Sequence, residues 1–284
     1  MNRHAALRGL RFSKMHGAGN DFVVLDARAG LPVLSPEAIR WIADRRTGVG
    51  FDQLLTVEPG RSEGAALYYG IWNTDGSPAG QCGNGARCVA AWALRSGIVG
   101  DADFRMDSPS GVVGVHVHAA DDIEVRLGVP DFRASALPAL GVGAPDGVIE
   151  VDGAVHAYRG VSMGNPHALI EVAEVASAPV ARIGQALQAD RRFPDSVNVG
   201  FAEVRDPRHV LLRVYERGVG ETQACGSGAC AAVAVLAAHG RVDAAAGVAV
   251  DLPGGRLQIR WSGPGEPVHM RGPAVFVFEG EFCE

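Results

Sequence analysis

Two short segments of the sequence place a cysteine directly before a glycine-rich turn that leads into an apolar stretch. They read QCGNGA over residues 81–86 and ACGSGACAA over residues 224–232, so Cys82 and Cys225 lie 143 residues apart in a chain of 284. Glycines at a helix start let the backbone approach a ligand closely, and the free N–H groups there attract an anion. The same dipole stabilises a nearby thiolate. Each segment therefore combines an activated sulfur with a cradle for a carboxylate.

A pair of such cysteines suits the inversion of a carbon that carries a removable proton. One thiolate removes the proton from one face while the opposing thiol donates a proton to the other face. The helix N-termini meanwhile stabilise the negative charge that develops in the substrate carboxylate. One isolated Cys-Gly-x-Gly segment is explained more simply by a buried cysteine at a tight turn. Two copies in related halves of the chain favour the catalytic interpretation.

The similarity between the halves extends beyond the cysteines. The segment HGAGNDFVV resembles SMGNPHALI, FDQLLTV resembles VNVGFAEV, and IWNTDG aligns with VYERGVG. The aligned positions are Asn20 with Asn165, Gln53 with Asn198, and Asn73 with Glu216, at offsets of 143–145 residues. Four segments in the same order at nearly one offset predict an internal duplication.

The elements that position these residues are mostly short strands. Alternating or β-branched runs punctuated by Gly, Pro, Asp and Asn predict antiparallel sheet. Helices are expected over residues 35–46, 85–97 and 226–240, and the last two are apolar nearly all round, so they should be buried. The predicted fold is α+β, with two pseudosymmetric domains, each a curved, mostly antiparallel sheet or barrel wrapped around a central apolar helix. The active site is expected in the cleft between them.

The predicted domains are residues 1–125, joined by 271–284, and residues 126–270. The boundary is expected near residues 125–130, in the stretch LGVPDFRASALPAL, and the final strand AVFVFEG is compatible with either half.

Composition excludes several classes of protein. An apolar content of 47% with a net charge of −6 and no basic run indicates a globular chain that does not bind nucleic acid. No apolar stretch approaches the ~20 residues of a membrane span, and no signal peptide is visible, so we expect a cytoplasmic protein. The spacing of the five cysteines does not match a metal site, and no metal is expected.

A cofactor-free mechanism is also indicated. Amino-acid racemisation with pyridoxal phosphate needs a lysine, and Lys14 is the only lysine in the chain. No phosphate-binding cup is evident, and we expect Lys14 to be a solvated side chain at the end of the first strand. The predicted cofactor set is therefore empty.

The motifs together resemble those of the diaminopimelate epimerase family, in order and across essentially the whole chain. They are KMHGAGNDFVVLD, FDQLL, NTDGSPAGQCGNGARC, VSMGNPH, VNVGF and YERGVGETQACGSGACAA. The resemblance implies an isomerase independent of pyridoxal phosphate that interconverts LL- and meso-diaminopimelate, a step toward lysine and peptidoglycan precursors. It also implies a homodimer. Proline racemase and hydroxyproline epimerase belong to the same broader fold group and share a mechanism with two cysteines.

Carried over position by position, the resemblance implies that Cys82 and Cys225 are the acid–base pair. In the LL-to-meso direction, Cys225 is the implied base and Cys82 the implied acid. The implied substrate-binding residues are Asn20, Gln53, Asn73, Gly83, Asn84, Asn165, Asn198, Glu216, Arg217, Gly226 and Ser227. Backbone N–H groups of Gly83–Asn84 and Gly226–Ser227 would hold the reacting carboxylate, while Arg217 would bind the distal one. A forked guanidinium suits that task.

Simpler interpretations stay open for several of these residues. Asn20 and Asn165 follow glycines and are equally compatible with turn residues in the left-handed conformation. Glu216 and Arg217 are also compatible with a solvated charge pair at a strand end. His167 is expected in a supporting, hydrogen-bonding role rather than a catalytic one.

The remaining cysteines suggest no chemistry. Cys88 and Cys230 lie within the expected helices and should be inert core residues, and Cys283 has no evident role.

Two alternatives to the main functional hypothesis are retained. One is a related cofactor-independent epimerase or racemase of the proline or hydroxyproline type. The other is a non-catalytic amino-acid-binding protein or a thiol redox sensor. Sensing would explain two thiols but not two glycine-rich anion cradles. In each case the expected partner is a small amino acid, with no nucleic acid and no membrane.

Overall fold

The computed structural model describes residues 7–31, 34–80, 82–100, 103–133, 135 and 146–283. The chain divides into two compact units, which we call unit 1 (Met1–Val125 with Gly272–Glu284) and unit 2 (Arg126–Arg271). Of the stretch 127–140 expected at the boundary, residues 134 and 136–140 lie outside the described residues. None of the described helices has the length and apolar character needed to cross a membrane.

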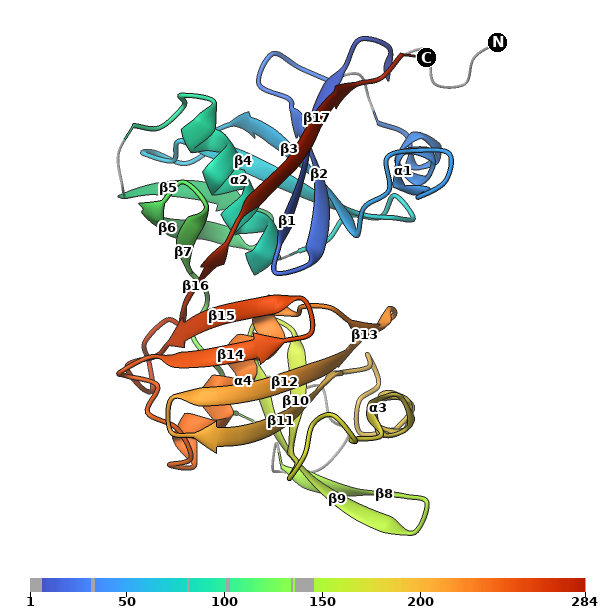
Figure 1. The fold of residues 1–284 in the computed structure, drawn as a ribbon, viewed down its shortest axis with the longest axis vertical. Coiled ribbons are helices and arrows are strands. Elements are labelled where there is room, and N and C mark those ends of the chain that lie inside the picture. Colours follow the sequence, from blue (N-terminus) through green and yellow to red (C-terminus); the bar gives the residue numbers. More distant parts are fainter. Residues whose placement is uncertain are drawn as a thin grey trace. The chain divides into compact units, whose positions relative to one another are not determined.

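The described part of unit 1 contains a mixed sheet and two helices (Figure 1). Its elements are β1 (Arg11–Gly17), β2 (Asn20–Asp26), α1 (Pro36–Ala43), β3 (Gln53–Pro59), β4 (Leu67–Asn73), α2 (Gly83–Arg95), β5 (Asp103–Ser108), β6 (Gly111–Ala119), β7 (Asp122–Arg126) and β17 (Val275–Glu281). Strand β1 pairs antiparallel with both β17 and β2, so the final strand joins unit 1. Beyond β2 the pairing is parallel with β3, then antiparallel to β4, parallel to β5 and antiparallel to β6.

Unit 2 repeats this order. Its elements are β8 (Gly147–Val151), β9 (Ala154–Ser162), β10 (Pro166–Glu171), α3 (Val180–Gln188), β11 (Asn198–Asp206), β12 (His209–Glu216), β13 (Gly220–Thr222), α4 (Gly226–Ala238), β14 (Val248–Leu252), β15 (Gly255–Arg260) and β16 (His269–Pro273). From β9 to β15 the pairings alternate as in unit 1: antiparallel with β10, parallel with β11, antiparallel with β12, parallel with β14 and antiparallel with β15. The prediction of an α+β fold with an internal duplication is confirmed.

The duplication holds at the level of single residue pairs. In the parallel pair of unit 1, Phe22 lies opposite Gln53, and in that of unit 2, His167 lies opposite Asn198. Phe22 corresponds to His167, and Gln53 corresponds to Asn198. Both correspondences have the same sequence offset that aligns Asn20 with Asn165. The two sheets therefore share a register as well as a topology.

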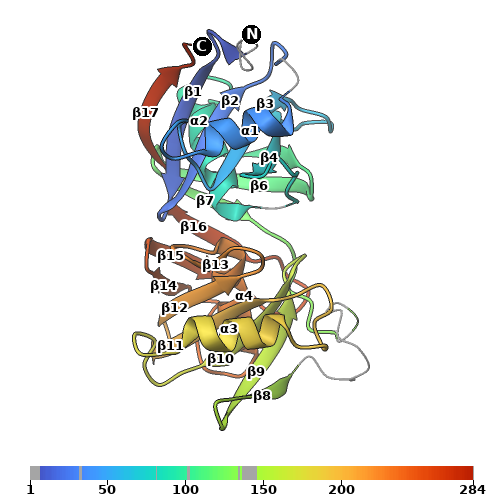
Figure 2. The ribbon, with the colours of Figure 1, turned by 90° about the vertical axis from the view of Figure 1, so that its right-hand side faces the viewer.

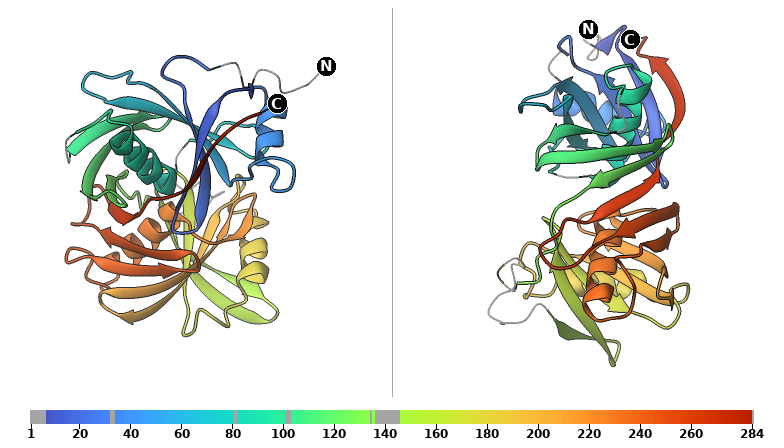
Figure 3. Two further views of the ribbon diagram at one scale, coloured as in Figure 1. Left: turned by 45° about the horizontal axis from the view of Figure 1, so that its top comes forward. Right: turned by 90° about the vertical axis from the view of Figure 1, so that its left-hand side faces the viewer.

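Helices α2 and α4 are the buried centres of the two units (Figure 3). Helix α2 contacts β1, β2, β3 and β6, and α4 contacts the equivalent strands β9, β10, β11 and β15. Each helix is followed by a glycine with positive φ, Gly97 and Gly240, where an L side chain would be strained. The expectation of two buried apolar helices is confirmed. Arg87 is the exception to their apolar character, because its side chain is fully buried in α2, with Nε 3.4 Å from the carbonyl oxygen of Pro273.

Helices α1 and α3 occupy matching places against the sheets, as Figure 2 shows within each unit. Helix α1 begins as expected, with Ser35 Oγ accepting a hydrogen bond from the amide of Ala38 at 3.2 Å and Pro36 in the first turn. Helix α3 was not predicted, although its buried residues Val180, Ile183 and Leu187 have helical spacing. Pro179 precedes it without a side-chain cap, so the usual start signal is missing.

We expect Gly184→Ala to destabilise the protein, because a Cβ at Gly184 would lie 2.5–2.7 Å from atoms of the Tyr215 side chain. Crowding of this kind costs about 1–3 kcal/mol, whereas alanine in a helix otherwise gains about 1 kcal/mol over glycine. Urea unfolding should therefore show a net loss.

Gly128→Ala is the matched control, because no atom lies within 4 Å of its Cβ position. We expect it to change stability by less than about 1 kcal/mol. Equal stability of the two variants would contradict the close packing of α3 on β12.

Candidate active site

The sheet of unit 1 brings the predicted polar residues to one edge. Strands β2 and β3 run parallel and begin at Asn20 and Gln53, so these residues share an edge. Strand β4 runs the other way and ends at Asn73, directly opposite Gln53. The side chains of the last two meet, with Gln53 Nε2 donating to Asn73 Oδ1 at 3.3 Å. Helix α2 begins after Cys82.

Unit 2 builds the same edge with different side chains. Asn165 immediately precedes β10, Asn198 begins the parallel strand β11, and Glu216 ends the antiparallel strand β12. Cys225 then precedes α4. The structure thus gathers the residues predicted for each half at an equivalent edge of its own unit.

Cys82 is the N-cap residue of α2 and makes polar contacts through its sulfur. Its Sγ accepts a hydrogen bond from the amide of Gly85 at 3.3 Å. The same sulfur donates to Asn20 Oδ1 at 3.7 Å. The same Asn20 oxygen accepts a bond from Asn84 Nδ2 at 3.3 Å. The thiol is partly exposed, whereas Asn84 is buried. The sulfur, the Asn20 amide and the first turn of α2 therefore form one contiguous polar site.

Cys225 occupies the N-cap position of α4 in a drier environment. It is 4% exposed, and its Sγ lies 3.6 Å from Ser227 Oγ. Burial raises the pKa of this thiol well above its ordinary value, and the negative charge of Glu216 raises it further. The hydrogen bond with Ser227 acts in the opposite direction and lowers the pKa. The surroundings of Cys225 therefore favour its thiol form over the thiolate.

Glycines let each helix start approach its surroundings. A Cβ at Gly228 would lie 3.2 Å from Cys225 Sγ and 3.1 Å from a methyl group of Val214. A Cβ at Gly85, the equivalent position, would lie 3.2 Å from Leu55. Gly83 and Gly226 are buried in the first turn, where helix geometry directs the backbone N–H groups outward. Free N–H groups at a helix start attract an anion such as a carboxylate.

The two predicted asparagines are not left-handed turn residues. Positive φ angles occur at the preceding Gly19 (+85°) and Gly164 (+91°), and neither Asn20 nor Asn165 is among the non-glycine residues with positive φ. The glycines make the turns, which leaves the asparagine side chains at the strand edge for polar contacts.

His167 is a buried, neutral partner of Asn165. It is 3% exposed, and its Nε2 lies 3.1 Å from Asn165 Oδ1. Burial, together with the positive charge of Arg217, lowers the pKa of His167 to about 3. Because the amide oxygen of Asn165 can only accept, the neutral ring carries its proton on Nε2 and donates it to that oxygen.

Glu216 and Arg217 point to separate partners in the described structure. Glu216 Oε1 accepts a hydrogen bond from Thr222 Oγ1 at 2.5 Å, while Arg217 Nη1 donates to the carbonyl of Asp195 at 3.0 Å. The backbone amide of Arg217 donates to Asn198 Oδ1 at 2.9 Å. Arg217 is exposed, so its guanidinium is accessible to a solvent-borne anion.

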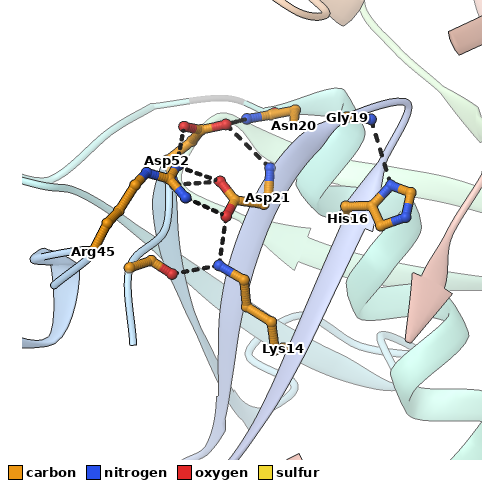
Figure 4. Close-up of polar contacts among 8 residues, drawn as sticks. Lys14, His16, Gly19, Asn20, Asp21, Arg45 and Asp52 are labelled. Carbon is orange, nitrogen blue, oxygen red and sulfur yellow. Dashed lines mark hydrogen bonds and ion pairs between the residues drawn. The ribbon is translucent and has the colours of Figure 1, made fainter. Parts of the chain in front are cut away.

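Lys14 is buried, so the expectation of a solvated side chain was wrong. It is 8% exposed and forms an ion pair of 2.5 Å with Asp21 (Figure 4). Arg45 forms a bidentate pair with Asp21, at 2.8 Å for both bonds, and also contacts Asp52 at 2.9 Å. Asp52 in turn accepts a hydrogen bond from Asn20. We call these four residues, Lys14, Asp21, Arg45 and Asp52, the ion cluster.

Sequence reasoning missed the ion cluster, although a signal was present. Asp21 follows Asn20 and Asp52 precedes Gln53, so each aspartate adjoins a predicted site residue at the start of a parallel strand. If the starts of these two parallel strands are placed side by side, the carboxylates of Asp21 and Asp52 come together. Two neighbouring carboxylates need cations to balance their charge.

The other cysteines lie away from this chemistry. Cys88 and Cys230 are buried within α2 and α4, and burial raises the pKa of Cys88 to about 12. Cys283 is exposed near the end of the chain.

We expect His167→Gln to flatten the acid side of the stability–pH curve. The folded-state pKa lies below the ordinary value of 6.5, so the unfolded chain binds the extra proton between about pH 6.5 and 3. Stability should fall as the pH drops through this range, by up to about 1.4 kcal/mol per pH unit from this residue. Glutamine keeps a donor for Asn165 but does not titrate.

Urea unfolding at several pH values measures the effect, and His156→Gln, at a half-buried position of β9, is the control. Parallel curves for wild type and His167→Gln would show that His167 does not titrate with folding.

Comparison with solved structures places the fold. The structure superposes on a probable proline racemase from Agrobacterium radiobacter K84, solved with bound carbonate, with a TM-score of 0.70 and 15% identity, over 96% of this chain and 92% of that one. A hydroxyproline epimerase from Agrobacterium vitis, solved with bound trans-4-OH-L-proline, matches with a TM-score of 0.70 and 15% identity, over 95% and 91% of the chains. At this identity the likeness concerns the fold alone.

Sequence comparison is more specific. The chain is 56% identical over 275 residues to the diaminopimelate epimerase of Xanthomonas axonopodis pv. citri (strain 306), covering 96% of both chains. It is also 53% identical over 276 residues to the O-ureido-serine racemase of Streptomyces lavendulae, covering 96% of this chain and 95% of that one. The sequence model of the family described as diaminopimelate epimerase matches residues 12–133 and 160–277. The chain belongs to the diaminopimelate epimerase family.

Proposed function

We propose that this protein is a diaminopimelate epimerase that interconverts LL- and meso-2,6-diaminopimelate by proton transfer at one α-carbon. The observation that carries the proposal is the placement of Cys82 and Cys225 as N-cap residues at equivalent points of two repeated units. Each thiol is accompanied by a glycine-rich helix start. Membership of the family and the high identity to a named diaminopimelate epimerase support the choice of substrate.

In this proposal the two thiols exchange one proton each with the substrate. In the LL-to-meso direction, the thiolate of Cys225 removes the α-proton and becomes a thiol, while the thiol of Cys82 protonates the other face and becomes a thiolate. The reverse reaction exchanges the two roles. Burial raises the pKa of Cys225, so its thiol must first release its proton to solvent before the step begins, and the thiolate that remains is a strong base for a weakly acidic C–H bond.

The proposed binding roles divide the substrate into a reacting and a distal end. The N–H groups of Gly83–Asn84 and Gly226–Ser227 hold the reacting carboxylate and stabilise the charge that spreads into it. We assign the distal amino-acid group to the remaining polar residues of the two edges: Asn73, Asn198, Glu216 and Arg217, with Asn20, Gln53 and Asn165 completing the pocket. The proposal also divides the chain into an N-terminal and a C-terminal epimerase half that correspond to the repeats.

We expect Cys82→Ala and Cys225→Ala each to reduce epimerisation at least about a thousandfold, because each removes one of two obligatory proton carriers. In deuterated water, wild-type enzyme should place deuterium on the α-carbon of newly formed meso product. At early times, the LL substrate that has not yet reacted should carry no deuterium. NMR and chiral chromatography measure both quantities.

The matched controls are Cys88→Ala and Cys230→Ala, which remove buried thiols from the same two helices. They should stay active with at most a modest loss of stability. Product that appears without deuterium would contradict the two-base mechanism, and turnover by either single variant would contradict the assigned cysteines.

An O-ureido-serine racemase is a second candidate, favoured by the 53% identity to the Streptomyces protein. The two substrates differ at the distal end, since a ureido group is neutral whereas diaminopimelate carries a carboxylate and an ammonium there. A guanidinium at Arg217 and a carboxylate at Glu216 match the charged end better.

We expect Arg217→Gln to raise the KM for diaminopimelate about 10- to 100-fold with a smaller change in kcat, because it removes a charge-assisted hydrogen bond to the distal carboxylate. Arg182→Gln, which removes an exposed arginine paired with Asp152, is the control and should leave KM unchanged. Faster turnover of O-ureido-serine by the wild type, together with an indifferent Arg217→Gln, would favour the second candidate.

A further inference from the structure

The ion cluster holds the carboxylate of Asp52 in a fixed orientation. Arg45 donates to its Oδ1 at 2.9 Å, and the amide of Asp21 donates to its Oδ2 at 3.1 Å. The contact is reciprocal, because the amide of Asp52 donates to Asp21 Oδ1 at 3.0 Å. Lys14 and Arg45 supply the positive charge that balances the two carboxylates. Asp52 is therefore braced on both oxygens.

This braced carboxylate determines which way the side-chain amide of Asn20 faces. An ionised carboxylate only accepts hydrogen bonds, so the group that Asn20 presents to it must be the NH₂ group. The structure has this arrangement, with Asn20 Nδ2 donating to Asp52 Oδ2 at 2.9 Å (Figure 4). The oxygen of the amide is consequently turned the other way, toward the start of α2.

The Asn20 oxygen meets two donors there. One is the NH₂ group of Asn84 at 3.3 Å and the other is the sulfur of Cys82 at 3.7 Å. The sulfur also accepts a hydrogen bond from the amide of Gly85. Cys82 can donate to Asn20 only as a thiol, because a thiolate has no proton to give.

We propose that Asp52 is a positioning residue that keeps Cys82 protonated at rest by fixing the Asn20 amide with its oxygen toward the sulfur. The inference rests on the proposed function for its catalytic meaning, since a resting thiol is the form that donates a proton in the LL-to-meso direction. The contacts on which it depends all lie within unit 1.

Unit 2 does not orient its asparagine with a carboxylate. Val197 stands at the position equivalent to Asp52, and the oxygen of Asn165 accepts a hydrogen bond from neutral His167. A donor thus binds the Asn165 oxygen, whereas an acceptor binds the Asn20 nitrogen. The duplicated asparagines are therefore oriented by opposite chemistry.

The decisive variant is Asp52→Asn. Its amide has one oxygen, which the charged guanidinium of Arg45 should take because a charge-assisted hydrogen bond outweighs the one that the amide of Asp21 then loses. The new NH₂ group is left toward Asn20. Asn20 then turns over and presents its own NH₂ group to Cys82, where a donor favours the thiolate. Iodoacetamide reacts with the thiolate, so the alkylation rate of Cys82 at pH 7.5, followed by peptide mass spectrometry, should rise about tenfold, which is the scale of one exchanged hydrogen bond.

Two further variants separate this effect from loss of charge. Asp21→Asn removes the same charge from the same cluster without touching the Asn20 amide, and should change the rate less than about threefold. Asn20→Ala removes the acceptor directly, so the rate should also rise. In that background, adding Asp52→Asn should have no further effect on Cys82.

Circular dichroism verifies folding, and Asn20→Ala carries the test should Asp52→Asn not fold. An unchanged rate in folded Asp52→Asn, or an equal increase with and without Asn20, would overturn the proposal. Because alkylation requires no turnover, these outcomes are independent of whether diaminopimelate is the substrate.

Discussion

The parallel pairing of β2 with β3, and of β10 with β11, is the constraint on which the site depends. Parallel strands must be joined by a crossover, which α1 and α3 provide, and they begin at the same edge of the sheet. Residues about thirty positions apart in sequence, such as Asn20 and Asp52, therefore meet at that edge. The antiparallel strand that follows returns to the same edge, and the next helix starts there. A hairpin in place of either crossover would leave the cysteine without its polar neighbours.

The sequence was sufficient for features that local chemistry determines. Cysteine before Gly-x-Gly predicted both helix starts, Ser35 and Pro36 predicted α1, and the repeated spacing predicted the duplication. Helix α3 was missed because Pro179 gives no capping signal and Gly184 interrupts an otherwise regular apolar face. That glycine is required by the side chain of Tyr215, which lies just over thirty residues later in β12, and no local pattern reveals this contact.

The burial of Lys14 was unpredictable for a related reason. A lysine in a short strand is normally solvated, and the burial of Lys14 is acceptable only because its ammonium group pairs with Asp21 and donates to the carbonyl oxygen of Gly50. These partners are brought together by the crossover. The candidate site could thus be located from sequence, whereas the groups that orient it required the three-dimensional arrangement. The duplication preserves strand pairing more strictly than polar chemistry, since Gln53 and Asn73 in one unit correspond to Asn198 and Glu216 in the other.

The buried position of the single lysine also gives the molecule an internal reporter. A protease specific for lysine has one cleavage site in this chain, after Lys14, and β1 lies between β17 and β2 in the sheet. An intact strand cannot enter a protease active site, so cleavage requires unit 1 to open locally. The rate of that single cut therefore reports the opening of the unit that holds Cys82, without labels and without interference from a second site.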